Sequence, residues 1–122
     1  VNAEVELTLP GGDKIVAIVT EGSVKSLGLA VGKAAIAYVK APWVMVLAGT
    51  QDVRFSARNQ LAGSVSKIQK GAVNTEVAIT LPGGTTVFAV VTHEAVLELG
   101  LKEGVPASAL IKASSVILGV SD

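Results

Sequence analysis

Apolar and polar residues alternate near the start of the chain, and the same alternation returns 72 positions later. Residues 4–9 place an apolar side chain at every second position, which is the period of a half-buried strand. Pro10-Gly11-Gly12 supplies a tight reversal, and residues 15–19 form a β-branched return strand. The pattern predicts a β-hairpin over residues 4–20 and a second hairpin over residues 77–91.

A short helix is predicted after each hairpin, over residues 23–27 and residues 94–99. Gly28 and Gly100 end these helices, since glycine readily adopts the left-handed conformation that follows a last helical turn. Thr20 and Thr92 precede the helices and are placed to cap them. Each copy then predicts two more strands, at residues 34–39 and 44–47 in the first and at residues 107–111 and 116–120 in the second.

The recurrence is a duplication, because about 22 of 50 aligned pairs are identical without a gap. Only the second copy carries an additional opening segment, which begins with Ser56-Ala57-Arg58-Asn59. By the repeat register, the first copy should begin about 17 residues before Val1. We therefore predict an all-β chain of two tandem OB-type barrels, each of about five strands with one short helix. The first module spans residues 1–47, a linker spans residues 48–55, and the second module spans residues 56–122.

The amino-acid composition indicates more apolar surface than a soluble monomer of this size usually has. Half of the residues are apolar, only 3% are aromatic, and the mean hydropathy is +0.60. No apolar run approaches the roughly 18 residues that a membrane span needs, so no membrane association is expected. We interpret the excess hydrophobicity as surface buried between subunits; the alternative is a core rich in valine and alanine in a monomer.

Charge and aromatic content exclude other partners. Ten acidic and ten basic residues give a net charge of zero, which provides no general attraction for nucleic acid. Only four aromatic side chains are available to stack on bases. The absence of cysteine excludes disulfides and thiolate metal sites and is compatible with a reducing compartment.

Catalytic signals are weak. His93 is the only histidine, and its counterpart in the first copy is Glu21. No spacing places two carboxylates together for acid and base catalysis, and no nucleophile triad or metal-ligand pattern occurs. The glycines follow hairpins rather than a phosphate-binding fingerprint. We expect neither an enzyme nor direct coordination of a metal by the protein.

Small hydrogen-bond donors stand out instead. Ser56-Ala57-Arg58-Asn59 offers a hydroxyl, a guanidinium, an amide and consecutive backbone N–H groups. Lys40-Ala41 and Lys112-Ala113-Ser114 each place one cation where an apolar strand is interrupted. Donors without a carboxylate acceptor suit a fully deprotonated oxyanion, whereas a protonated phosphate needs an acceptor for its own hydrogen. The alternative is an ordinary turn and solvated lysines.

A family resemblance strengthens the oxyanion hypothesis. The string SARNQLAGSVSKIQKGAVNTEV, followed by LPGG, VT, LGL and IKASSVIL, resembles the Mop (molybdopterin-binding, TOBE-type) module of molybdate-binding proteins. The resemblance covers residues 56–120 and, from Val1, the first copy to about residue 47. The tandem arrangement is similar to molbindins and to the sensor half of molybdate-responsive transcription regulators.

The resemblance implies an OB-type fold, oligomerisation, and molybdate or tungstate bound at subunit or module interfaces. It implies donors from five short segments of this chain. The implied oxyanion-binding residues are Thr20, Ser23, Lys40, Ala41, Ser56, Ala57, Arg58, Asn59, Thr92, Lys112, Ala113 and Ser114. Ala95 replaces Ser23 in the second copy, so its equivalent site loses one hydroxyl.

The expected function is cytoplasmic storage and homeostasis of molybdate or tungstate, with the oxyanion as ligand and no catalytic cofactor. The alternative is a molybdate-sensing domain whose DNA-binding region lies upstream. The molbindin resemblance favours a homotrimer and the regulator resemblance a dimer. No nucleic acid is expected to bind through these residues.

Overall fold

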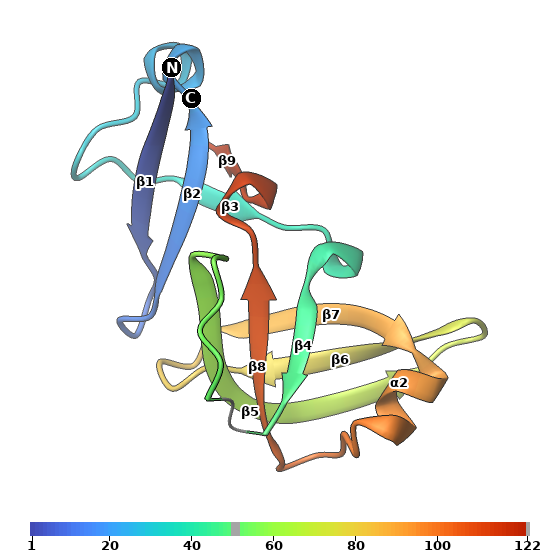
Figure 1. Ribbon diagram of the computed structural model, residues 1–122. Coiled ribbons are helices and arrows are strands. Elements are labelled where there is room, and N and C mark those ends of the chain that lie inside the picture. The colour runs from blue at the N-terminus through green and yellow to red at the C-terminus, as the bar shows by residue number, and fades with distance from the viewer. Residues whose placement is uncertain (50–51, 122) are drawn as a thin grey trace.

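A computed structural model describes residues 1–49 and 52–121 (Figure 1). Two hairpins dominate it: β1 (Asn2–Thr8) with β2 (Lys14–Thr20), and β6 (Asn74–Thr80) with β7 (Thr86–Thr92). The short helices α1 (Glu21–Leu27) and α2 (His93–Glu98) follow them. The remaining elements are β3 (Ile36–Tyr38), η1 (Ala41–Trp43), β4 (Met45–Ala48), β5 (Asn59–Lys70), β8 (Pro106–Ile111), η2 (Ala113–Ser115) and β9 (Ile117–Gly119).

The predicted hairpins and helices are present, and the predicted caps are confirmed. The Thr20 side chain accepts a hydrogen bond from the Ser23 backbone N–H, and Thr92 accepts one from Ala95. Gly28, with φ of 64°, ends α1 in the left-handed conformation. Of the four later strands, β4 and β8 lie close to their predicted bounds, whereas β3 and β9 are shorter than predicted and contain only three residues each.

The strands form three sheets. β1 pairs with β2, β3 pairs with β9, and a five-stranded sheet has the order β4-β8-β5-β6-β7. The long β5 connects β8 to the β6–β7 hairpin, because its first half pairs with β8 and its second half with β6. The fold is mostly β, as predicted, and OB-like, but its sheets do not close into complete barrels.

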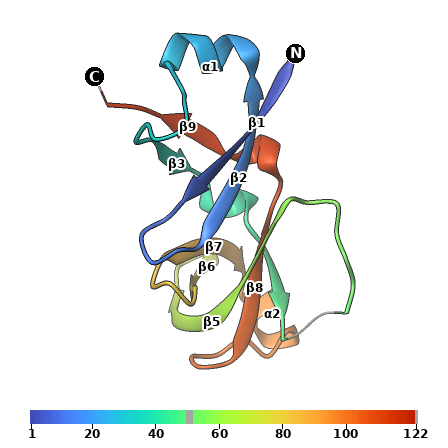
Figure 2. The same cartoon turned by 90° about the vertical axis from the view of Figure 1, so that its left-hand side faces the viewer.

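The last strands of the two copies are exchanged. In the repeat register β4 corresponds to β9, and β3 corresponds to β8. β4 of the first copy nevertheless pairs with β8 of the second, from Met45 opposite Leu110 to Ala48 opposite Ala107. β9 of the second copy pairs in turn with β3 of the first. Each copy therefore completes the other, and Figure 2 shows β9 lying beside β3 near the first hairpin.

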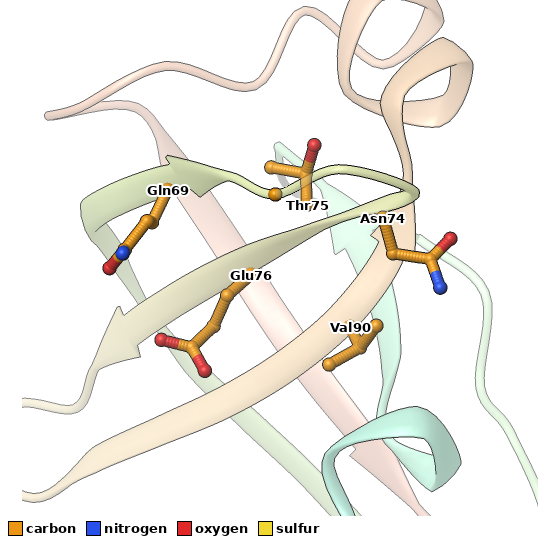
Figure 3. Close-up of a pocket in the computed structure, with 6 residues that line it drawn as sticks. Gln69, Asn74, Thr75, Glu76 and Val90 are labelled. Carbon is orange, nitrogen blue, oxygen red and sulfur yellow. The ribbon is translucent and has the colours of Figure 1, made fainter.

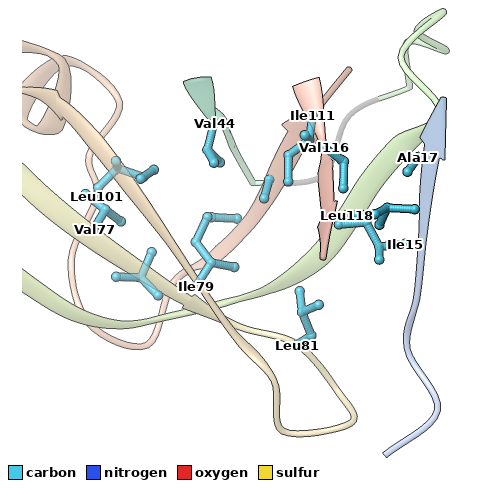
Figure 4. Close-up of a cluster of buried hydrophobic side chains, with 14 residues drawn as sticks. Ile15, Ala17, Val44, Val77, Ile79, Leu81, Leu101, Ile111, Val116 and Leu118 are labelled. Atoms are coloured by element: carbon cyan, nitrogen blue, oxygen red, sulfur yellow. The ribbon is translucent and has the colours of Figure 1, made fainter. Parts of the chain in front are cut away.

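One hydrophobic core runs through both copies (Figure 4). Val77 and Ile79 of β6 are fully buried, and Ile15 and Ala17 of β2 belong to the same cluster. The exchanged β9 contributes Leu118 to it. The two sequence copies are therefore not two separate cores.

The two hairpin tips touch each other. The Gly83 backbone N–H donates to the Asp13 carboxylate over 2.9 Å. A Cβ on Gly11 would lie 1.9 Å from the Gly83 carbonyl oxygen, so only glycine fits there. The contact joins the copies at a second place, away from the exchanged strands.

Candidate oxyanion-binding site

An open cavity of about 570 Å³ brings two of the predicted donor segments together. The loop before β5 approaches from one side and η2 from the other, over β2 of the first copy. The predicted donor residues that line it are Ser56, Ala57, Arg58, Lys112, Ala113 and Ser114. Ile18, Met45, Phe55 and Leu110 complete the wall, so the donors stand on an apolar floor.

Lys112 is one of the two cations that line this cavity. It is exposed, and among residues 1–49 and 52–121 it forms no ion pair. The 3₁₀ turn η2 starts directly after it, and Ala113 is buried while Ser114 stays exposed. The first N–H groups of such a turn have no partner within the turn and can donate to an anion.

Arg58 has an acidic partner that the donor-only pattern did not predict. Its guanidinium forms an ion pair with Glu4 of β1, and both side chains are about half exposed. Sequence alternation placed Glu4 on the exposed face of its strand but gave no sign of a contact across 54 positions. Arg58 is therefore held at the cavity by a charge of the first copy.

Asn59 has a different position from the one expected for a ligand. It is 2% exposed, and its amide Nδ2 donates to the Val16 carbonyl oxygen over 2.8 Å. Its Oδ1 accepts from the Val16 backbone N–H over 2.7 Å. Because both amide atoms are bonded to Val16 and the side chain is buried, the Asn59 amide faces β2 and does not line the cavity. It instead fixes the Ser56–Arg58 loop against β2.

The other predicted donors lie outside this cavity. Thr20 and Ser23 bond to each other at the start of α1, and Thr92 caps α2. Lys40 stands over the Trp43 ring at 5.4 Å, and Ala41 opens η1. This cavity therefore joins six of the twelve predicted residues.

A second hollow lies at the turn between β5 and β6 (Figure 3). Gln69, Asn74, Thr75, Glu76 and Val90 line it. Thr75 is hydrogen-bonded to His93, so the single histidine is held at the entry to α2. Only one carboxylate faces this hollow, which gives no acid and base pair.

Among residues 1–49 and 52–121, no cluster of three or more His, Cys, Asp and Glu side chains could hold a metal ion. No helix of that same part of the chain has the length and apolar character to cross a membrane.

The match to a known protein family covers both sequence copies. The TOBE domain family model matches residues 1–46 and 56–118. The chain belongs to the TOBE domain family. Its TOBE fold is also similar to a crystal structure described as the cytoplasmic molybdate-binding protein ModG with molybdate bound. That likeness has a TM-score of 0.92 and 57% identity, and covers 99% of this chain and 86% of that one.

Two curated relatives align with nearly the whole of this chain. The molybdenum-pterin-binding protein MopA of Rhodobacter capsulatus is 47% identical over 120 residues, covering 98% of this chain and 45% of MopA. The molybdenum transport protein ModE of Azotobacter vinelandii is 44% identical, covering 98% of this chain and 44% of ModE. The chain thus spans less than half the length of these two relatives.

Proposed function

We propose that this TOBE protein binds molybdate or tungstate reversibly and serves storage and homeostasis of the oxyanion in the cytoplasm. The observation that carries the proposal is the cavity in which Ser56–Arg58 and Lys112–Ser114 converge. Similarity to the cytoplasmic molybdate-binding protein ModG supports both the ligand and the compartment. Binding uses hydrogen bonds and the Lys112 ammonium, with no catalytic step and no direct bond from protein to metal.

The chemistry of the cavity favours a fully ionised tetrahedral dianion. The oxygens of such a dianion only accept hydrogen bonds. Lys112 and the N–H and hydroxyl donors beside it can therefore donate to them without needing an acceptor in return. The one nearby carboxylate, Glu4, is engaged by Arg58 and so offers little to a protonated phosphate oxygen. Sulfate carries the same charge as molybdate, so its exclusion depends on the size of the cavity.

Calorimetry with molybdate, tungstate, sulfate and phosphate tests the proposal. We expect the first two anions to bind and the last two to bind at least about tenfold more weakly, a difference of about 1.4 kcal/mol. Equal binding of all four anions, or no binding of any, would refute the proposal.

Lys112→Ala isolates the proposed cation. We expect it to weaken molybdate binding by about 1.5–3 kcal/mol, the range of hydrogen bonds to charged groups. Lys70→Ala is the matched control, because Lys70 is an exposed lysine at the far end of β5. A Lys112→Ala protein that binds molybdate as tightly as the Lys70→Ala protein would place the site elsewhere.

A second candidate function is the ligand-sensing part of a transcription regulator. Similarity to ModE over 98% of this chain favours it. The same cavity would bind the anion, and the output would pass to a DNA-binding region. A protein that binds molybdate but lacks any DNA-binding region in its full-length gene product supports storage over sensing.

We also propose a homo-oligomer, with a trimer favoured over a dimer. Several large apolar side chains are exposed on this chain, among them Tyr38, Trp43, Met45 and Ile117 at 44–56%. An interface would cover them and could bring Thr20 and Ser23 of one subunit to the cavity of another. Light scattering distinguishes the two assemblies.

A further inference from the structure

Glu4 places a negative charge at the rim of the proposed oxyanion cavity. It lies on β1 opposite Ile18 of β2, and Ile18 belongs to the cavity wall. Its carboxylate forms an ion pair with the Arg58 guanidinium, and both side chains are half exposed. A carboxylate beside an anion site repels the anion. The ion pair therefore alters the charge that the cavity offers to its ligand.

The ion pair leaves one unmatched cation at the cavity. Arg58 and Lys112 are the two charged residues among those that line it. Glu4 is the partner of Arg58, whereas Lys112 forms no ion pair within residues 1–49 and 52–121. The cavity and its rim together carry one net positive charge, where two free cations would carry two.

The backbone of the Ser56–Arg58 loop is anchored independently of this ion pair. The next residue, Asn59, is buried and bonds both the N–H and the carbonyl oxygen of Val16. The contact with Glu4 involves only the exposed end of the Arg58 side chain. Loss of the Glu4 charge should therefore free the guanidinium without displacing the loop.

Fixed and mobile donors discriminate between anions in different ways. The N–H and hydroxyl groups of an anchored loop and of the 3₁₀ turn η2 bond fully only to an ion of matching size. A free arginine side chain follows an ion of any size, and its guanidinium binds carboxylates and phosphates alike. Sulfate is smaller than molybdate and leaves more of its oxygens without a fixed donor. It therefore gains more than molybdate from a mobile guanidinium.

We propose that Glu4 is a positioning residue that sets the selectivity of the cavity, because it engages the Arg58 guanidinium and withholds it from the anion. Recognition then depends on Lys112 and on the fixed donors of the Ser56–Arg58 loop and η2. Arg58 contributes its backbone to the site and its side chain to Glu4. The inference rests on the proposed function, since it concerns the selectivity of the same cavity.

Glu4→Gln tests the proposal, because it keeps the length of the side chain and removes its charge. Calorimetry should show a sulfate affinity at least about tenfold above that of the native protein, as for one additional hydrogen bond to a charged group. Molybdate affinity should rise less, so the ratio of molybdate to sulfate affinity should fall. Glu6→Gln is the matched control, since Glu6 is an exposed acid of the same strand that pairs with Lys14 outside the cavity. Equal sulfate affinities of the two variants would overturn the proposal.

A double variant shows whether the gain comes from Arg58. Glu4→Gln combined with Arg58→Gln should lose the gained sulfate binding, because no free guanidinium remains. Added sodium chloride gives an independent readout. The sulfate affinity of the Glu4→Gln protein should fall more steeply with salt than that of the native protein, since its site carries one more net positive charge. A gain that persists in the double variant, or equal salt dependences, would contradict the role of Glu4.

The same titrations separate this proposal from the proposed function. A native protein that binds neither molybdate nor tungstate refutes the proposed function. Sulfate binding that appears in the Glu4→Gln protein and disappears in the double variant would still support the role of Glu4, and its absence would refute both proposals. A native protein that binds molybdate, with sulfate affinity unchanged or lower in the Glu4→Gln protein, refutes the role of Glu4 alone.

Discussion

Asn59 shows how one side chain can carry both a fold and a site. Its amide replaces a neighbouring strand for Val16, and it orients the loop that carries Ser56 and Arg58. An amide is suited to this role, since its oxygen can accept from a backbone N–H while its nitrogen donates to the carbonyl of the same residue. The residue connects the second copy to the first at the rim of the proposed oxyanion cavity.

We predict that Asn59→Ala lowers the free energy of unfolding by about 3 kcal/mol, because it leaves the Val16 N–H and carbonyl buried without partners. Urea denaturation measures the loss. Gln60→Ala is the control, since Gln60 is exposed and its loss should stay within about 0.5 kcal/mol. Equal stabilities of the two variants would show that water replaces the amide at no cost.

At the scale of elements, β5 is the strand whose geometry restricts its amino-acid sequence most. It leaves β8 and joins β6 near Gly63 and Ser64, and its register shifts between Val65 and Lys67. A Cβ on Gly63 would lie 2.3 Å from the Thr80 carbonyl oxygen. The absence of a side chain therefore allows two backbones to approach at the crossing.

We predict that Gly63→Ala destabilises the protein by about 1–3 kcal/mol, because the strands must separate to admit a methyl group. Gly22→Ala is the opposite case. Gly22 lies in α1, and its Cβ would meet only the Thr20 hydroxyl at 3.8 Å. Alanine there should raise the free energy of unfolding by about 0.5–1 kcal/mol. Thermal unfolding of both variants gives the signs, and a shift in the same direction would contradict this account.

Local elements could be predicted from the sequence, but their pairing could not. Alternation, Pro-Gly-Gly and capping threonines act over a few residues, and they located both hairpins and both helices. β4 and β9 have the same apolar character, so either could satisfy β3 or β8, and nothing local selects the exchange. The same limit applies to the site. Residue type predicted Lys112 and Arg58 as candidate donors, and both line the cavity, whereas the Glu4 pair and the Asn59 clamp depend on contacts between copies.

At the scale of the whole molecule, the core is continuous across both copies. We predict a single cooperative unfolding transition, with coincident curves from far-UV circular dichroism and from Trp43, the only tryptophan. Val65→Ala, in the second copy, should shift both curves equally although Trp43 belongs to the first. A fluorescence transition that stays unchanged in this variant would show two independent units.

The strand exchange also has a consequence for how the protein arose and persists. Two separate single-copy chains that exchanged their last strands would form a domain-swapped dimer, which dissociates on dilution. A short covalent connection between the two copies makes the strand exchange intramolecular. Each copy then meets the other at an effective concentration in the millimolar range, as for a short flexible linker. The arrangement then survives dilution far below that effective concentration. Neither half can be deleted during evolution without removing a strand from the half that remains.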